Sequence, residues 1–276
     1  MSSDTDVIRA LVSGHPTGLV MDFDGVLSRI TDDPARSELL PGTERILESL
    51  AGKLSTVALL SGRPVAFLAE RAAIPGVDLY GSYGLERLTA GGIDVLPEAS
   101  QWKSAVRAAT EELRRELDGV DGIHIEDKSL AVAIHWRRSL DHTAAEQLVG
   151  PIVERMISVH GLRREPGKCV EELRMPLDED KGTALHRIIR SDGLRTVAYA
   201  GDDRGDLPAF TAALTASGYA LVVDAPDAAE EVSRVPGAHF ASPEEFQNWL
   251  QRLDDALTWN SSRRPAGMHE EHQLPV

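Results

Sequence analysis

Cysteine is nearly absent from this 276-residue chain, and long apolar runs are missing altogether. The single cysteine, Cys169, excludes a disulfide within the chain and a zinc site built on several thiolates, so we interpret it as a small apolar side chain. No stretch approaches the ~20 apolar residues of a membrane-spanning helix, and the polar, acidic residues 1–16 lack the apolar core of a signal peptide. We therefore expect a cytoplasmic protein.

Positive charge is also scarce. The chain has 29 Lys and Arg against 44 Asp and Glu, which gives a formal net charge of −15. Such a field repels nucleic acid backbones and anionic membrane surfaces, so we expect neither as a partner. The composition does not indicate an oligomeric state.

Short β-branched runs alternate with segments of helical spacing. The runs 18–21, 55–60, 195–200 and 219–224 read as buried parallel strands, and residues 63–73 read as a helix between two of them. This pattern predicts an α/β fold with a Rossmann-like parallel-sheet core. A capped helix is expected from Ser242, with Glu245 as its capping-box partner.

A stretch of different character interrupts this pattern. Residues 98–176 predict a helix, two alternating strands, another helix and another strand, which together indicate an inserted second α/β domain, named the cap below after the family resemblance. The alternation is clean over residues 130–137, where apolar side chains occupy every second position. We predict a core of residues 1–97 and 177–258, the cap at 98–176, and a disordered tail at 259–276.

Two aspartates follow the first predicted strand. In an open parallel sheet, ligands bind at the carboxyl ends of the strands, which is where Asp22 and Asp24 lie. Two neighbouring carboxylates repel each other unless a cation or a proton intervenes, and Mg²⁺ favours such oxygen ligands. On this motif alone, a solvated turn is an equally good interpretation.

Two further predicted strands end in polar residues. Ser61, Gly62 and Arg63 precede a helix opened by Pro64, an arrangement suited to phosphate, although Ser61 alone is better interpreted as a helix cap. The other strand ends in an acidic cluster: Asp202, Asp203 and Asp206. A surface acidic loop is the alternative there. Lys181 supplies the positive charge that clustered carboxylates and a phosphate need.

These motifs and their order resemble the haloacid dehalogenase superfamily of phosphotransferases. The resemblance implies that Asp22 is the nucleophile, forming an aspartyl-phosphate, and that Asp24 is the general acid and base. It implies that Ser61, Gly62 and Lys181 hold the phosphoryl group. It also implies that Asp22, the backbone carbonyl of Asp24 and Asp202 hold Mg²⁺, with Asp203 and Asp206 behind them.

The segments 81–86, 126–137 and 166–185 resemble the trehalose-6-phosphate phosphatase family, and the likeness runs from about Gly18 to Leu257. It implies sugar-binding roles for Glu126, Lys128 and Glu172, for which the alternative is an ion pair on a solvated face. Further residues are possible substrate contacts or packing residues: Arg63, Tyr83, His135, Arg137, Lys168 and Arg174.

Three positions depart from the family pattern. Val26 replaces a usual Thr, Tyr83 a usual His, and Gly205 to Leu207 a usual Thr-Asp-Glu. None of these positions is among the residues expected to bind the metal or the phosphoryl group directly. We therefore expect catalysis to be retained, at a lower rate or on another substrate.

The resemblance implies a Mg²⁺-dependent phosphatase that hydrolyses trehalose 6-phosphate to trehalose and phosphate. The alternatives are a phosphatase for another sugar phosphate, such as a sucrose phosphate, a glycosyl phosphoglycerate or a trehalose-like pseudo-disaccharide phosphate. A further alternative is a catalytically silent homologue that binds a sugar phosphate and regulates a partner.

Overall fold

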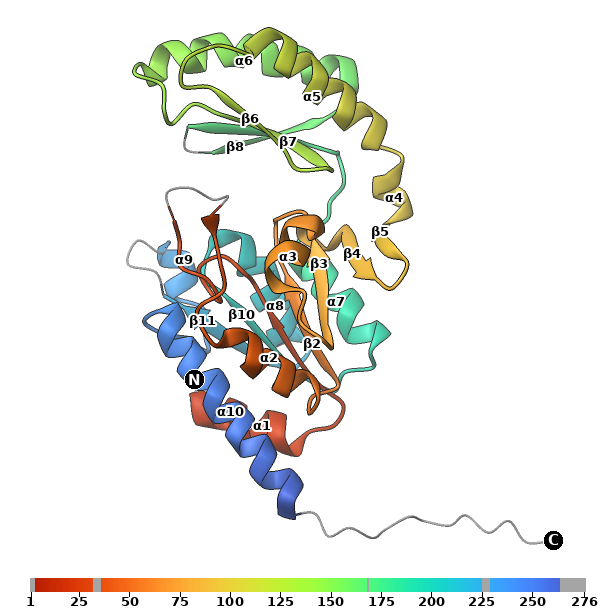
Figure 1. Ribbon diagram of the computed structural model, residues 1–276, viewed down its shortest axis with the longest axis vertical. Coiled ribbons are helices and arrows are strands. Elements are labelled where there is room, and N and C mark those ends of the chain that lie inside the picture. The colour runs from red at the N-terminus through yellow and green to blue at the C-terminus, as the bar shows by residue number, and fades with distance from the viewer. Residues whose placement is uncertain (1–2, 32–35, 168, 225–228, 264–276) are drawn as a thin grey trace, which may run out of the picture.

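A central sheet of eight strands forms the larger part of the computed structural model (Figure 1), which describes residues 3–31, 36–167, 169–224 and 229–263. The strand order is β12-β11-β10-β1-β2-β3-β4-β5; the pairs from β12 to β3 are parallel, and β4 and β5 are added antiparallel. The strands are β1 (Thr17–Met21), β2 (Thr56–Leu60), β3 (Val77–Gly81), β4 (Glu86–Thr89), β5 (Gly92–Val95), β10 (Thr196–Gly201), β11 (Tyr219–Val223) and β12 (Ala238–Phe240).

Helices cover both faces of this sheet, which is why its central strands are apolar throughout. In β1, Leu19 and Met21 pack with one group of helices and Val20 with the other. The first group is α1 (Asp4–Ser13), α2 (Thr43–Ala51), α3 (Val65–Ala72) and α10 (Pro243–Arg263). The second group is α7 (Lys181–Ser191), α8 (Leu207–Thr215) and α9 (Glu230–Ser233).

A separate antiparallel sheet, in the order β6-β7-β9-β8, is inserted between β5 and α7. One face packs on two long helices through Val132, Ile134, Trp136 and Leu173, and the other face is turned toward the central sheet (Figure 1). Its elements follow the short helix α4 (Pro97–Ser100): α5 (Lys103–Leu117), β6 (His124–Asp127), β7 (Ala131–His135), α6 (His142–His160), β8 (Arg163–Gly167) and β9 (Val170–Arg174).

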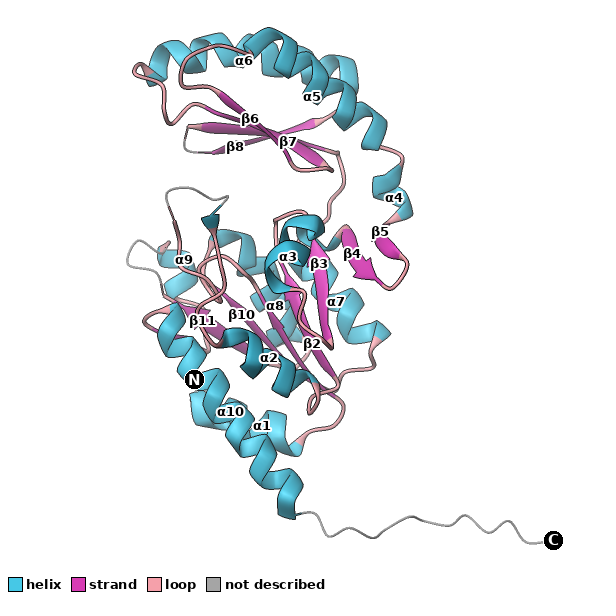
Figure 2. Ribbon diagram, in the orientation of Figure 1, coloured by secondary structure: helices cyan, strands magenta, loops and turns pink. Residues whose placement is uncertain are grey.

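The predicted fold class is confirmed, and Figure 2 shows the alternation of strands and helices on which it was based. Several strands were not predicted, among them β3, β4, β5 and β12 of the central sheet, and α6 is followed by a hairpin of two strands instead of the single strand expected. β8 escaped prediction because it is an exposed edge strand, Arg163–Gly167, whose charges and proline show no apolar alternation. The domain boundaries remain a prediction.

The C-terminal helix begins as predicted and ends later. The N–H of Glu245 donates to Ser242 Oγ at 3.2 Å, but the Glu245 carboxylate accepts from the N–H of Ala241 instead of Ser242. The expectation of a disordered tail from residue 259 is wrong for its first residues, since α10 continues to Arg263. Asn260 Nδ2 donates to the carbonyl of Val12 at 3.4 Å, which ties this end to α1. Residues 264–276 lie outside the described part of the chain.

In the described ranges, no helix is long and apolar enough to cross a membrane.

Candidate active site

Three neighbouring strands of the central sheet end in polar residues at one edge. β1 lies between β10 and β2, so Asp22, Ser61 and Asp202, which directly follow them, are brought together. The N–H of Asp22 continues the sheet pairing by donating to the carbonyl of Ala200 at 2.9 Å. Asp22, Ser61 and Asp202 are 5%, 2% and 6% exposed, so the interpretation as a solvated turn residue is wrong for Asp22, whereas the side chain of Asp24 is 31% exposed.

A tight turn after β1 allows the carboxylates to approach. Gly25 has a φ of 72°, and a Cβ at this position would lie 2.0 Å from Asp202 Oδ2. Any other residue would therefore push Asp202 away from Asp22. The turn is closed by the N–H groups of Leu27 and Ser28, which both donate to the carbonyl of Phe23.

Four carboxylates gather around this turn. One oxygen from each of Asp22, Asp202, Asp203 and Asp206 lies within 4.8 Å of the others. Burial raises the pKa of Asp22 to about 7, and burial together with the charge of Asp22 raises the pKa of Asp202 to about 9. The cluster therefore lacks positive charge for its number of carboxylates. Hard oxygen donors in this state suit a divalent cation.

Lys181, the first residue of α7, is the one cation the described residues place in this cluster. Its Nζ lies 2.7 Å from Asp22 Oδ2 and 2.7 Å from Asp206 Oδ1, and its side chain is 3% exposed. Asp206 also accepts from Tyr199 Oη at 2.5 Å and from the N–H groups of Asp202 and Asp203. Asp206 thus uses both oxygens within the protein and holds Lys181 and the Asp202 loop in place.

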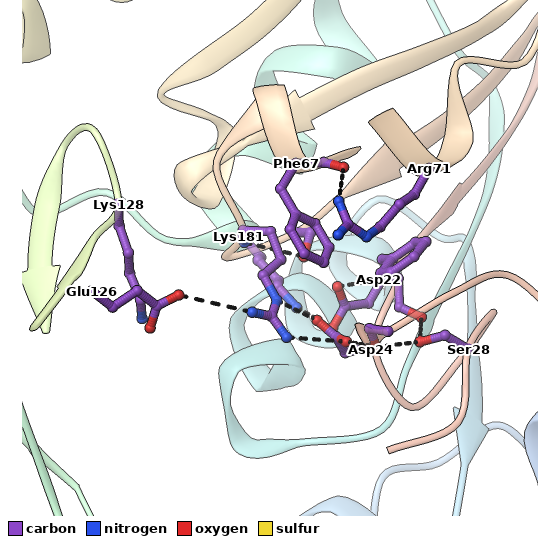
Figure 3. Close-up of polar contacts among 12 residues, drawn as sticks. Asp22, Asp24, Ser28, Phe67, Arg71, Glu126, Lys128 and Lys181 are labelled. Atoms are coloured by element: carbon purple, nitrogen blue, oxygen red, sulfur yellow. Dashed lines mark hydrogen bonds and ion pairs between the residues drawn. The ribbon is translucent and has the colours of Figure 1, made fainter. Parts of the chain in front are cut away.

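Asp24 is not one of the four clustered carboxylates and has partners of its own. Its Oδ2 accepts from Arg63 Nε at 2.7 Å, and its Oδ1 accepts from Ser37 Oγ at 2.5 Å. The Arg63 guanidinium also lies 4.7 Å from the centre of the Phe67 ring. Figure 3 shows Asp24 beside Asp22, with Lys181 behind them.

The segment that carries Ser61 and Gly62 is held in place by hydrogen bonds to residues of β3 and β4. The N–H of Ser61 donates to the carbonyl of Tyr80 at 3.0 Å. Ser61 is not the cap of the following helix: α3 begins at Val65, whose N–H donates to Glu86 Oε2 at 2.9 Å. Glu86 is 2% exposed and also accepts from Ser82 Oγ. The sequence motif at 81–86 contains Glu86. Its hydrogen bond to the start of α3 was missed because the donor, Val65, lies 21 residues earlier in the chain.

The inner face of the second sheet carries the predicted sugar-binding residues. Ala133 pairs with Glu126 on one side and Glu172 on the other, so both carboxylates lie in one row across the sheet. Lys128 Nζ lies 2.5 Å from Glu172 Oε2, and these side chains are 22% and 14% exposed. They do form an ion pair, but not on a solvated face.

The charges on this face are held by mutual contacts. His135 Nε2 and Glu126 Oε2 are 2.8 Å apart, and this hydrogen bond lowers the pKa of Glu126. Burial alone would lower the pKa of Lys128, but Glu172 and Glu126 together raise it. Arg63 Nη1 lies 3.9 Å from Glu126 Oε1, so this one side chain reaches from Asp24 to the second sheet.

Of the remaining predicted substrate contacts, some lie near the site and others do not. Arg174 stands over the Tyr83 ring, with its Cζ 4.1 Å from the ring centre. Arg137 is exposed beyond the end of β7 and is not brought to the site. Lys168 lies outside the described residues. Of the departures from the family pattern, Val26 is fully buried among apolar side chains, and Leu207 begins α8.

Comparison with known proteins agrees with this geometry. The trehalose-phosphatase family model matches residues 20–240. The trehalose-phosphate phosphatase of Mycobacterium avium (strain 104) is 34% identical over 278 residues, which cover 93% of this chain and 68% of that protein.

Solved structures share the fold. A trehalose-6-phosphate phosphatase related protein has a TM-score of 0.74 at 19% identity, covering 90% of this chain and all of its own. A haloacid dehalogenase-like hydrolase from Bacteroides thetaiotaomicron has a TM-score of 0.60 at 15% identity, covering 86% of this chain and 99% of its own. Because the family model spans residues 20–240 and a relative is 34% identical over nearly the whole chain, the chain belongs to the trehalose-phosphatase family.

Proposed function

We propose that this protein hydrolyses trehalose 6-phosphate to trehalose and phosphate, with Asp22 as nucleophile and Mg²⁺ as cofactor. The observation that carries the proposal is the meeting of two sets of residues. A carboxylate and lysine cluster at the ends of β1 and β10 faces a row of polar side chains on the second sheet, and Arg63 joins Asp24, two residues after Asp22, to Glu126 on that sheet. One set suits a phosphoryl group and the other suits sugar hydroxyls.

Each protein group has a defined task in this scheme. Asp22 attacks phosphorus and forms an aspartyl-phosphate, while Asp24 gives a proton to the leaving sugar oxygen and then takes one from the attacking water. Lys181 and Ser61 hold the phosphoryl oxygens. Lys181 already lies 2.7 Å from Asp22, so it stands where the phosphoryl charge would arrive.

Mg²⁺ fits the donor set. Asp22, Asp202 and the backbone carbonyl of Asp24 would hold the ion, because burial first, and then the neighbouring carboxylates, raise the pKa values of Asp22 and Asp202, and a bound cation would offset both effects. When bound, the ion neutralises charge on the phosphoryl oxygens and on these carboxylates. Asp206 is already occupied by Lys181 and Tyr199 and would remain behind the ion.

Phosphate release tests the proposal, measured with Mg²⁺ and with EDTA on four substrates: trehalose 6-phosphate, glucose 6-phosphate, sucrose 6-phosphate and p-nitrophenyl phosphate. We expect kcat/KM for trehalose 6-phosphate to exceed the others by about 100-fold, equivalent to about 2.7 kcal/mol of transition-state discrimination. Equally low kcat/KM values on all four substrates would support a phosphatase but reject trehalose 6-phosphate as its specific substrate. No phosphate release from any of the four substrates would reject a phosphatase activity and favour a catalytically silent protein that binds a sugar phosphate.

A further inference from the structure

Tyr83 lies in an unusual turn that is bonded to the phosphate segment. The turn η2 (Ser82–Gly84) follows β3, and Ser82 and Tyr83 both have left-handed backbones, with φ of 50° and 59°. Residues other than glycine rarely adopt this conformation, so surrounding contacts must stabilise it. The N–H of Tyr83 donates to the carbonyl of Ser61 at 2.9 Å, and the N–H of Ser82 donates to that of Arg63 at 2.7 Å. The turn is thus fixed to the segment that carries the predicted phosphate ligands.

The Tyr83 ring fills the space between the phosphate segment and the second sheet. A Cβ at Gly62 would lie 2.9 Å from Tyr83 Cζ and 3.0 Å from its Oη, so the ring is packed directly on Gly62. The other contact is the Arg174 guanidinium, 4.1 Å from the ring centre. Arg174 Nε in turn lies 3.8 Å from Glu172 Oε1. Tyr83 therefore stands between a predicted phosphate ligand and a predicted sugar ligand.

Among the described residues the structure gives no hydrogen-bond partner for the Tyr83 hydroxyl, and this oxygen is not one of the fully buried unpaired atoms, so it is open to solvent or to a ligand. Burial, followed by the charge of Glu172, raises the pKa of the phenol, so it remains protonated near neutral pH. The hydroxyl is therefore able to donate to a bound ligand from a position between Gly62 and Arg174.

We propose that Tyr83 is a specificity-determining residue, whose hydroxyl donates a hydrogen bond to a hydroxyl of the sugar ring that carries the phosphate. The ring, held between Gly62 and Arg174, sets the position of this donor. This inference rests on the proposed function, because it requires a sugar phosphate in the site. It goes further in assigning recognition of the first sugar ring to the core, beside the cap residues Glu126, Lys128 and Glu172.

The variant Tyr83→Phe tests the inference, since it keeps the ring and its packing and removes only the hydroxyl. We expect the ratio of kcat/KM for trehalose 6-phosphate to that for p-nitrophenyl phosphate to fall about 5- to 10-fold, the worth of one neutral hydrogen bond. A purely structural role would lower both values together and leave their ratio unchanged. Tyr80→Phe is the matched control, because it makes the same change on β3 outside the site and should leave the ratio at the wild-type value.

Binding provides a second measurement that does not depend on turnover. In the Asp22→Asn background, Tyr83→Phe should raise the Kd of trehalose 6-phosphate about 5- to 10-fold and that of inorganic phosphate by less than twofold. An unchanged Kd for trehalose 6-phosphate, or equal changes for both ligands, would overturn the inference. If wild-type protein neither hydrolyses nor binds trehalose 6-phosphate, the proposed function itself fails, which is a different result from a wild-type protein that Tyr83→Phe leaves unaffected.

Discussion

Asp22 combines deep burial, a lysine partner and three neighbouring carboxylates. Its Oδ2 faces Lys181 at 2.7 Å, and its Oδ1 accepts from the N–H of Phe23 at 2.7 Å. Such a carboxylate is stable only where a counter-charge is at hand, and Lys181 alone is shared with Asp206. The presence of a carboxylate at position 22 is therefore better explained by a role in the reaction than by a contribution to the stability of the fold.

Asp22→Asn should abolish phosphate release, with kcat reduced by at least about 10³-fold, because the amide is not a nucleophile toward phosphorus. The fold should persist, since Asn occupies the same volume and relieves repulsion in the cluster. Circular dichroism and single-turnover assays measure the two effects. Asp94→Asn on exposed β5 makes the same change away from the site and should retain full activity. Substantial turnover by Asp22→Asn would reject Asp22 as the nucleophile.

Glu172 tests the assignment of the second sheet to the sugar. Glu172→Ala removes a carboxylate that holds Lys128 at 2.5 Å and would accept from sugar hydroxyls. We expect KM for trehalose 6-phosphate to rise about 10- to 100-fold, the range for hydrogen bonds to charged groups, and KM for p-nitrophenyl phosphate to change little. Steady-state kinetics on both substrates measures this. Glu154→Ala on α6 is the control, and equal effects of Glu172→Ala on both substrates would remove Glu172 from the sugar site.

At the scale of elements, the position of the site residues at the strand ends could be predicted from the sequence. The hydrogen bonds that hold these segments in place could not. Asp22, Ser61 and Asp202 each follow an apolar run, and the carboxyl-end rule places such residues at one edge. Glu86 was not predictable in this way, because it acts on the first N–H of α3 from a different strand. The edge strand β8 lacks apolar alternation, so its sequence does not distinguish it from a loop.

Glu86→Ala should therefore loosen the start of α3 and the phosphate segment before it. Its carboxylate accepts from the N–H of Val65 and from Ser82 Oγ, and both donors would be left buried without a partner. We expect the free energy of unfolding to fall by about 2 kcal/mol, and kcat/KM to fall on all phosphate substrates alike. Urea unfolding measures the first effect. Glu70→Ala, an exposed position on α3, should change stability by less than about 0.5 kcal/mol; the same small change in Glu86→Ala would contradict the bracing role.

At the scale of the whole molecule, the site depends on two sheets that face each other (Figure 1). Arg63 and Tyr83 of the core contact Glu126 and Arg174 of the second sheet. The sequence indicates an insertion and its alternating face, so the presence of a cap could be predicted. The contacts between its face and the core could not, since Arg63 and Glu126 are brought together only when both sheets have formed. Family resemblance supplied the sugar-binding residues, and the cross-strand register explains why Glu126 and Glu172 lie side by side.

Because of the acidic cluster, we expect the stability of the whole molecule to depend on the proposed metal. Carboxylates of Asp22, Asp202 and Asp203 lie within 4.8 Å of one another and share the charge of Lys181 with Asp206. Because Mg²⁺ would bind the folded state alone, a concentration 100 times its Kd should raise the free energy of unfolding by about 2.7 kcal/mol. The melting temperature should then rise by about 5 °C or more, and EDTA should reverse the shift and stop phosphate release. Asp202→Asn should lose most of the shift while the Asp94→Asn control keeps it. A melting temperature indifferent to Mg²⁺, with phosphate release undiminished in EDTA, would show that the cluster works without a divalent cation.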